Sequence, residues 1–268
     1  MLLQMCLVGC YQPPSSPNNE LTDAPSAVLR IKLPFTNPSS LRLTGADPSL
    51  AFDETELWSV VSGTPFDLQM AKSEGVPPSW TNDPMAVMRL NIGPASEVEP
   101  ALTKDGLLLA FASDRSGGAH QLYLAKRNTI SLLFDAPIQT NLTFPADFRG
   151  FDMSPDGLKL YIVDNGMLRV MKRTSPTGEF VFDKMISVPD ANFRYPSVSF
   201  DELEIIYNDK NTQRVMHATL AADKKSYENP TALQVGESCS LLEDADLSAD
   251  AMTVVYNCDG FIHIARRQ

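Results

Sequence analysis

Apolar and polar positions alternate along most of the chain in short runs, and these runs recur in a fixed order. Each unit has an alternating run, a polar step containing aspartate, and a second run rich in aromatic and β-branched residues. Alternation with a period of two is typical of half-buried β-strands. Five such segments align without gaps, beginning at Asp47, Glu99, Gly150, Tyr195 and Asp244. The pattern therefore predicts five strand–turn–strand units.

The turn at the centre of each unit has its own signature. An aspartate stands there in every unit, and two residues earlier stands a small residue, alanine, serine or threonine. Aspartate can bond its own backbone in a tight turn, and glycine after it can adopt positive φ. The aspartates, separated by 52, 51, 45 and 49 residues, are Asp53, Asp105, Asp156, Asp201 and Asp250.

Two further strands follow in most units. Third strands are predicted over residues 66–71, 121–126, 168–173, 214–220 and 261–267. Weaker fourth strands are predicted over residues 87–92, near 138–143, and over 180–188 and 231–236. Four strands in a repeat of about 50 residues are typical of a β-propeller blade.

These units predict an all-β fold: a single five-bladed β-propeller of four-stranded antiparallel blades over residues 27–268. The fifth unit ends after its third strand at Gln268. We expect its fourth strand to come from residues 28–33, so that an N-terminal strand closes the ring and removes an exposed sheet edge. The alternative is that residues 28–33 pair elsewhere and a sixth, degenerate blade exists.

The repeat also resembles a known family. The segments Ser154-Pro-Asp-Gly-Leu-Lys-Leu-Tyr and Lys104-Asp-Gly-Leu-Leu-Leu-Ala-Phe-Ala-Ser-Asp-Arg-Ser-Gly-Gly are similar to the repeat of TolB-type, WD40-like (PD40) propellers. The other three units keep the aspartate and lack the glycine. The resemblance implies the propeller fold and hints at partners in the cell envelope, but propellers host many unrelated activities.

The N-terminus resembles a bacterial lipoprotein leader. Leu7-Val8-Gly9-Cys10 looks like a lipobox, although no Lys or Arg precedes Cys10. The resemblance implies a signal segment over residues 1–10, a diacylated Cys10 and an outer-membrane-anchored protein of the bacterial envelope. Residues 11–26, rich in Pro, Ser and Asn, then form a flexible tether. The alternative is an ordinary apolar N-terminus with a buried cysteine.

The composition of the chain limits the classes of partner that we expect. Lys plus Arg total 22 and Asp plus Glu total 33, so the net charge is −11, which argues against a nucleic-acid partner. No run of eighteen apolar residues predicts a transmembrane helix, so a lipid anchor is the expected membrane contact. No phosphate-binding or metal-binding motif occurs, and we expect neither cofactor nor metal. We expect a monomer.

Two cysteines lie in the fifth unit. Pairing its first two strands about Asp250 sets Leu242 opposite Cys258 and brings Cys239 within one loop of it. An oxidising compartment would permit a disulfide between Cys239 and Cys258, and the alternative is two free thiols. Neither cysteine belongs to a C-x-x-C pair, which argues against a metal site. The histidines, His120, His217 and His263, fall on or beside third strands of different blades and are interpreted as sheet residues.

Charged residues gather where the first strands begin and where second strands turn into third strands. Both places belong to one rim of the central channel, and loops on one face of a scaffold commonly bind ligands. The same acids can equally cap turns and face water. The candidate binding residues on this rim are Asp47, Glu99, Asp114, Arg115, Arg149, Arg194, Tyr195 and Asp244.

Three functions fit these observations. We expect a non-enzymatic module that binds an envelope protein or glycan through the rim, with no catalytic residue. The first alternative is a glycoside hydrolase in which Glu99 is the acid and Asp47 and Asp152 act as base and modulator. The second alternative is a structural scaffold of the envelope.

Overall fold

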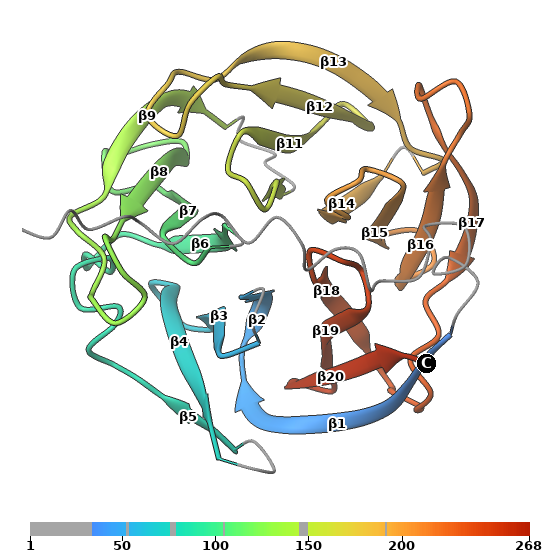
Figure 1. The fold of residues 1–268 in the computed structure, drawn as a ribbon, viewed down its shortest axis with the longest axis horizontal. Helices are drawn as coiled ribbons and strands as arrows, with labels where there is room; N and C mark the ends of the chain where they lie inside the picture. Colours follow the sequence, from blue (N-terminus) through green and yellow to red (C-terminus); the bar gives the residue numbers. More distant parts are fainter. Residues whose placement is uncertain (1–33, 52–53, 76–78, 104, 145–149, 191) are drawn as a thin grey trace, which may run out of the picture.

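Five four-stranded antiparallel sheets are arranged around a central channel in the computed structural model (Figure 1). The structure describes residues 34–51, 54–75, 79–103, 105–144, 150–190 and 192–268. The chain is therefore an all-β, five-bladed propeller, as predicted. The predicted signal segment and tether lie outside the described residues, and so does Asp53.

Each blade runs outward from the channel in sequence order, except in blade five, where the chain's first strand is outermost. Blade one contains β2 (Ala46–Leu50), β3 (Glu56–Val61), β4 (Asp67–Glu74) and β5 (Ser79–Asn82). Blade two contains β6 (Glu97–Leu102), β7 (Leu108–Ser113), β8 (Gln121–Lys126) and β9 (Ile138–Thr143). Blade three contains β10 (Phe151–Met153), β11 (Lys159–Asp164), β12 (Met167–Lys172) and β13 (Val181–Ser187). Blade four contains β14 (Phe193–Val198), β15 (Glu204–Asp209), β16 (Arg214–Leu220) and β17 (Tyr227–Ala232). Blade five contains β18 (Leu242–Leu247), β19 (Thr253–Cys258), β20 (Phe261–Arg267) and β1 (Phe35–Thr44).

The ring is closed by an N-terminal strand, but by a later segment than the one predicted. Strand β1 pairs antiparallel with β20, from Phe35 opposite Arg267 to Thr44 opposite Phe261. Residues 28–33 lie outside the described part of the chain. Strand β1 contains two register shifts and has positive φ at Asn37 and Arg42. These irregularities hide the period-two pattern by which a strand is recognised in sequence.

The predicted fourth strand of blade one was also wrong. Strand β5 occupies that edge, and residues 87–92 form turns instead. Leu90 is fully buried there, and the Asn91 side chain bonds both the amide and the carbonyl of Leu68 at 3.0 and 2.9 Å. A side-chain amide thus satisfies backbone groups that a strand would otherwise pair. In blade four the fourth strand is β17, which begins four residues before the predicted one.

The repeated Ser/Thr and Asp residues build the turn between the first and second strands. In blade three the Ser154 hydroxyl donates to Asp156 at 2.6 Å and accepts the Lys159 amide at 2.8 Å. The Leu158 amide also donates to Asp156 at 2.9 Å. The residue after the aspartate has positive φ in all five blades, at Glu54, Gly106, Gly157, Glu202 and Ala251. In blades four and five the aspartate network therefore holds this conformation without a glycine.

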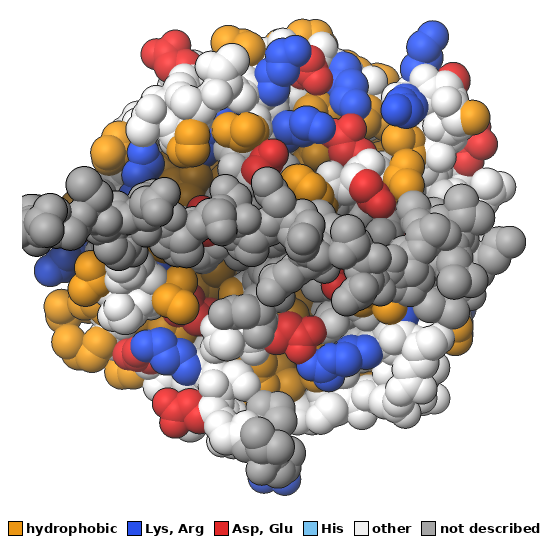
Figure 2. Space-filling view, viewed as in Figure 1, with side chains coloured by type: hydrophobic (Ala, Val, Ile, Leu, Met, Phe, Trp, Pro, Cys, Tyr) orange, Lys and Arg blue, Asp and Glu red, His pale blue; other side chains and the backbone are white. Residues whose placement is uncertain are grey.

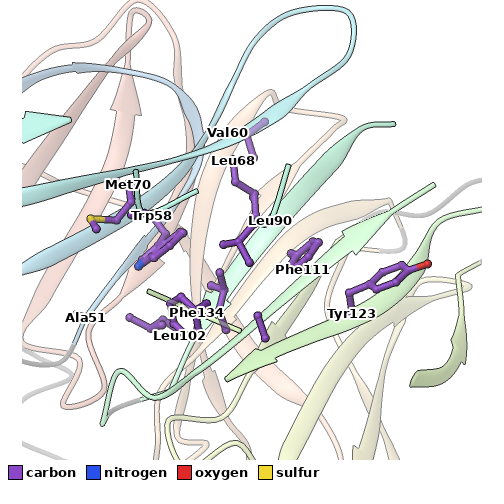
Figure 3. Packing of buried hydrophobic residues seen from close by; sticks show 13 residues of the cluster. Ala51, Trp58, Val60, Leu68, Met70, Leu90, Leu102, Phe111, Tyr123 and Phe134 are labelled. Atoms are coloured by element: carbon purple, nitrogen blue, oxygen red, sulfur yellow. The ribbon is translucent and has the colours of Figure 1, made fainter. Parts of the chain in front are cut away.

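The hydrophobic core is divided among the five blade interfaces. Each interface buries one cluster of side chains from two adjacent sheets. Figure 3 shows the cluster between blades one and two, where Trp58 lies beside Phe134 and Leu90. The two rings meet edge to face with centroids 5.5 Å apart, a favourable aromatic geometry. Trp58 is therefore a packing residue of this interface.

The described part of the chain contains no helix long and apolar enough to cross a membrane.

Candidate functional site

The inner strands that surround the channel share an unusual backbone feature. The aligned residue of each blade has positive φ, and in four of the five blades the register with the second strand shifts at that point. This is the geometry of a β-bulge, which redirects a side chain out of the regular pleat. The five residues are Asp47, Glu99, Gly150, Tyr195 and Asp244. The four with side chains all line the mouth of the channel.

Two of these carboxylates bond the backbone of the next blade. The Asp47 amide donates to the carboxylate of Asp244, and the Glu99 amide donates to the carboxylate of Asp47. The Asn208 side chain donates a further bond to Asp244 at 3.1 Å. Within the described part of the chain, no donor reaches the carboxylate of Glu99. The mouth thus joins blades five, one and two through acid side chains.

A second ring of bonds lies two residues further along each inner strand. Here a side-chain oxygen accepts the amide of the following blade's inner strand, at distances between 2.8 and 3.3 Å. The acceptors are Asp246, Ser49, Asp152 and Ser197, and the donors are the amides of Leu50, Leu102, Val198 and Leu247. In blade two the corresponding residue is Ala101, which offers no acceptor. The inner strands are therefore connected from blade to blade by side-chain caps.

Burial and mutual repulsion shift the titration of these acids. Desolvation is the main cause, and the pKa values of Asp47, Glu99 and Asp152 lie well above their ordinary range. The neighbouring carboxylates raise these three pKa values further. Burial also raises the pKa of Asp244 and of Asp246 to about 6. The folded protein therefore binds protons at these acids more tightly than an unfolded chain does.

The channel itself is narrow. The cavity at its mouth measures about 40 Å³, and a second cavity further along, lined by Asp152, Asp246 and Pro155, measures about 30 Å³. Sites for small organic ligands are commonly about 300–1,000 Å³. These cavities are large enough for water molecules and too small for a sugar ring.

A larger pocket opens beside the channel, between blades four and five. Its volume is about 380 Å³, and it shares Tyr195 and Asp244 with the channel mouth. The remaining lining comes from the β15–β16 turn, the end of β15 and the start of β18: Asn208, Asp209, Lys210, Gln213, Arg214, Leu241, Leu242 and Glu243, together with Arg194 of β14. Its size is in the range of ordinary ligand sites.

The charged side chains of this pocket differ in how they bond to the rest of the protein. Asp209 accepts bonds from the Asn211 amide and from Thr212, which hold the β15–β16 turn. Arg194, Lys210 and Arg214 make no ion pair with any described residue. The Nε atom of Arg194 is buried without a hydrogen-bond partner. The pocket therefore offers cationic donors to a negatively charged group.

The structure distributes the predicted rim residues among different roles. Asp47, Glu99, Tyr195 and Asp244 meet at the channel mouth, and Arg194 lines the adjoining pocket. Asp114 accepts the Ser96 amide at 2.8 Å and so caps a turn.

Arg115 points inward, away from any ligand on the rim. Its guanidinium bonds Glu97 at 3.0 Å and stacks 4.7 Å from the centroid of the Tyr123 ring. Arg149 lies outside the described residues. In the part of the face that grey atoms leave visible in Figure 2, acidic and basic side chains are intermixed.

Sequence reasoning missed the other residues of the pocket. Lys210, Gln213 and Arg214 belong to the loop that begins at Asp209, and this loop was placed on the correct rim by the repeat. Their signal in the sequence was their position one to five residues after the second strand of blade four. That position pointed to a binding pocket only once the neighbouring blade was in place.

Comparison with known proteins finds distant structural likenesses and no relative in sequence. The sequence matches no protein-family profile and no curated protein. Among solved structures, TolB from Acinetobacter baumannii is 14% identical, with 87% of this chain and 55% of that chain covered and a TM-score of 0.46. The periplasmic gluconolactonase of Pseudomonas aeruginosa is 13% identical, with 81% and 66% covered and a TM-score of 0.46. A functionally unknown protein from Desulfotomaculum acetoxidans is 14% identical, with 82% and 64% covered and a TM-score of 0.46.

The chain thus spans between about half and two thirds of the length of these proteins. The five-bladed fold rests on the structure itself, and no ligand or activity follows from likenesses this distant.

Proposed function

We propose that this protein is a non-enzymatic binding module, and that its ligand occupies the pocket between blades four and five. One observation carries the proposal: a pocket of about 380 Å³ contains three cationic side chains that form no ion pair within the described chain. A partner's carboxylate or other anion would supply the missing acceptors. The bulged inner strands place Tyr195 at the edge of the same pocket.

The chemistry of the pocket favours a protein segment over a glycan. Sugar-binding sites commonly use aromatic side chains as stacking platforms, and Tyr195 is the one aromatic residue in the lining. Arg194 and Arg214 are suited to bidentate recognition of a carboxylate. The partner is accordingly an acidic peptide segment of another envelope protein.

The place of action belongs to the same proposal. A diacyl group on Cys10 would hold the propeller at a bacterial outer membrane, with residues 11–26 as the tether. The disulfide between Cys239 and Cys258 supports an oxidising compartment such as the envelope. Replacement of Cys10 by Ser should release the protein from the membrane fraction. Unchanged membrane association would contradict the anchor.

The geometry gives less support to glycoside hydrolysis. That reaction needs two carboxylates with space for a sugar between them, whereas Asp47, Asp152 and Asp244 bond backbone amides around narrow cavities. Their raised pKa values follow from burial and mutual repulsion, which structural acids experience as well.

Capture of partners tests the proposal. The double variant Arg194→Ala/Arg214→Ala and the parent protein are immobilised and exposed to an envelope extract, and the bound proteins are identified by mass spectrometry. Arg89→Ala is the matched control, because Arg89 is exposed on blade one and lies outside the pocket. The proposal predicts that specific partners are lost from the double variant and retained by the control. Equal capture by all three proteins would contradict it and favour a purely structural scaffold.

A further inference from the structure

Three side chains with metal-binding atoms meet beside the disulfide of blade five. A carboxylate oxygen of Glu237, Sγ of Cys258 and a ring nitrogen of His263 all lie within 4.8 Å of one another. Cys258 ends β19, His263 lies in β20, and Glu237 belongs to the segment that leads from blade four into blade five. A fourth candidate ligand atom is Sγ of Cys239, which is bonded to Sγ of Cys258 at 2.09 Å.

Hydrogen bonds hold the carboxylate and the imidazole in place. Nδ1 of His263 lies 2.8 Å from Oε1 of Glu237, and the Tyr256 hydroxyl donates to the same oxygen. The Tyr256 and His263 rings are neighbours, with centroids 5.8 Å apart. Supporting contacts of this kind orient the ligands of metal sites. Cys258 is buried, whereas Glu237 and His263 remain partly accessible from solvent.

We propose that Cys239, Cys258, His263 and Glu237 form a zinc site when the disulfide is reduced. Two thiolates, an imidazole and a carboxylate are ligands that Zn²⁺ accepts in a tetrahedral arrangement. Bond lengths of about 2.3 Å to sulfur and about 2.0 Å to nitrogen or oxygen place the ligand atoms roughly 3.3–3.8 Å apart. The Cα atoms of the two cysteines are 5.4 Å apart, so side-chain rotation can bring the two sulfurs to that separation without moving the strands.

The spacing of the cysteines in the sequence argued against a metal site, because the two are 19 residues apart. The spacing of two cysteines in the sequence predicts a metal site only when the ligands lie close together along the chain. In this fold the remaining ligands come from different segments, which the pairing of β19 with β20 and the packing of blade four bring together.

The redox step balances as follows. A phosphine or dithiol reductant gives two electrons to the disulfide, the S–S bond breaks, and two protons from water complete the two thiols. Zn²⁺ then displaces both thiol protons, which pass to solvent. Nδ1 of His263 gives up to solvent the proton that bonds Glu237, Nε2 takes a proton from solvent, and Zn²⁺ binds Nδ1 of the neutral imidazole. A small disulfide oxidant reverses the order: it takes two electrons from the thiolates and is itself cleaved to two thiols with two protons from water, the protein S–S bond forms, and Zn²⁺ is released. The site is therefore occupied in reduced protein and lost in oxidised protein.

Metal binding by the full-length protein tests the proposal. Oxidised protein and protein reduced with a phosphine are incubated with Zn²⁺, desalted and assayed for zinc. We expect one zinc ion per chain after reduction and none before it. With Co²⁺ instead, the reduced protein should show the thiolate charge-transfer band and the strong visible bands of tetrahedral cobalt. Equal metal content in the two redox states would overturn the proposal.

Single-ligand variants separate a built site from simple thiol binding. His263→Ala and Glu237→Gln keep both cysteines. Loss of a residue that only orients a metal ligand weakens metal affinity roughly 10–100-fold, and each of these two variants should weaken zinc affinity by more than that. Tyr256→Phe should fall within that range, and Glu228→Gln, an exposed residue of β17, should have no effect. Wild-type affinity in His263→Ala and Glu237→Gln would overturn the proposal. Near-ultraviolet circular dichroism monitors the fold, and unfolding of the reduced protein despite bound zinc would also overturn it.

Discussion

Three blade interfaces bury an arginine in the same place, but only two of them supply its acid partner. Arg127 of blade two forms two bonds with Glu56 of blade one, at 3.1 and 2.7 Å. Arg267 of blade five likewise forms two bonds with Glu204 of blade four. Arg173 of blade three forms no ion pair with any described acid.

The difference comes from one residue of the repeat. Glu56 and Glu204 stand three residues after the turn aspartate, and Leu108 has that position in blade two. Arg173 keeps its other contacts, a bond from Nε to the Gly157 carbonyl at 2.7 Å and stacking on Phe180 at 4.5 Å. Its Nη2 atom is buried without a partner, and burial lowers the pKa of this guanidinium.

The comparison shows that aromatic stacking and a backbone carbonyl are sufficient to hold a buried arginine in this repeat. Where the repeat adds an acid, at Glu56 and Glu204, the acid and the arginine depend on each other. Removal of one partner lowers the stability of the fold, because the other is left as an uncompensated buried charge. The channel gives a contrasting case, in which no described cation forms an ion pair with the buried acids, and burial raises their pKa values.

Arg127→Met should produce the largest effect. The substitution leaves Glu56 buried with the Trp58 indole as its remaining side-chain donor at 3.4 Å. Loss of one partner of a buried pair costs about 3–5 kcal/mol. Urea denaturation measures it, with Arg89→Met as an exposed control that should change stability by less than about 0.5 kcal/mol. An equally small effect in Arg127→Met would contradict the assigned role of the pair.

The pH dependence of stability should reveal the uncompensated channel acids. Burial raises the pKa of Asp246 to about 6 in the folded protein, above its ordinary value of 3.8. The folded state therefore binds the proton more tightly, so this contribution is complete below about pH 4 and is lost as pH rises through 6. Asp246→Asn should remove a decline on the order of 2 kcal/mol between pH 4.5 and 7.5. Denaturation at several pH values tests this, and an unchanged decline in the variant would contradict it.

Arg173→Met should cost less than Arg127→Met. The variant loses one bond to the Gly157 carbonyl and the stacking on Phe180, and it leaves no buried carboxylate behind. We expect a loss of about 1–2 kcal/mol, measured in the same urea titrations. Equal losses at the two positions would show that the acid partner is irrelevant to the comparison.

Leu108→Glu should recreate the missing pair. In blade two the new carboxylate would stand where Glu56 and Glu204 stand, facing Arg173. A double-mutant cycle of Leu108→Glu with Arg173→Met should give a favourable coupling of about 1 kcal/mol between the new acid and the arginine. Absence of coupling would mean that Arg173 cannot turn toward this position.

The sequence allowed the blades to be predicted because each one repeats the same local chemistry. The Ser154–Asp156 turn and its counterparts depend on residues only two to five positions apart, so their pattern is visible without a structure. The closing strand and the edge of blade one were misplaced, because bulges in β1 and the side chain of Asn91 replace regular pairing.

The candidate site was predicted in part for the same reason. The repeat placed Asp244 and Tyr195 on one rim, but it could not show that the carboxylates bond the amides of adjacent blades. Those contacts join residues of different blades, 46 positions apart for Asp152 and Val198 and 197 positions apart for Asp47 and Asp244. The walls of the pocket beside Arg194 likewise come from two blades. The packing of whole blades decides which charged side chains bond to other residues of the protein and which face the pocket.

The most direct test compares the pocket with the channel in one binding experiment. Partner capture is measured for Arg194→Ala/Arg214→Ala and for Asp47→Asn/Asp246→Asn, whose two aspartates line the channel and not the pocket, with the fold of each variant verified by circular dichroism. We predict that the arginine variant loses its partner and that the aspartate variant retains it. The side-chain carbonyl oxygen of asparagine can still accept the hydrogen bonds from the backbone amides of the next blade. Retained capture by the arginine variant together with loss in the aspartate variant would contradict the account and place the functional site in the channel.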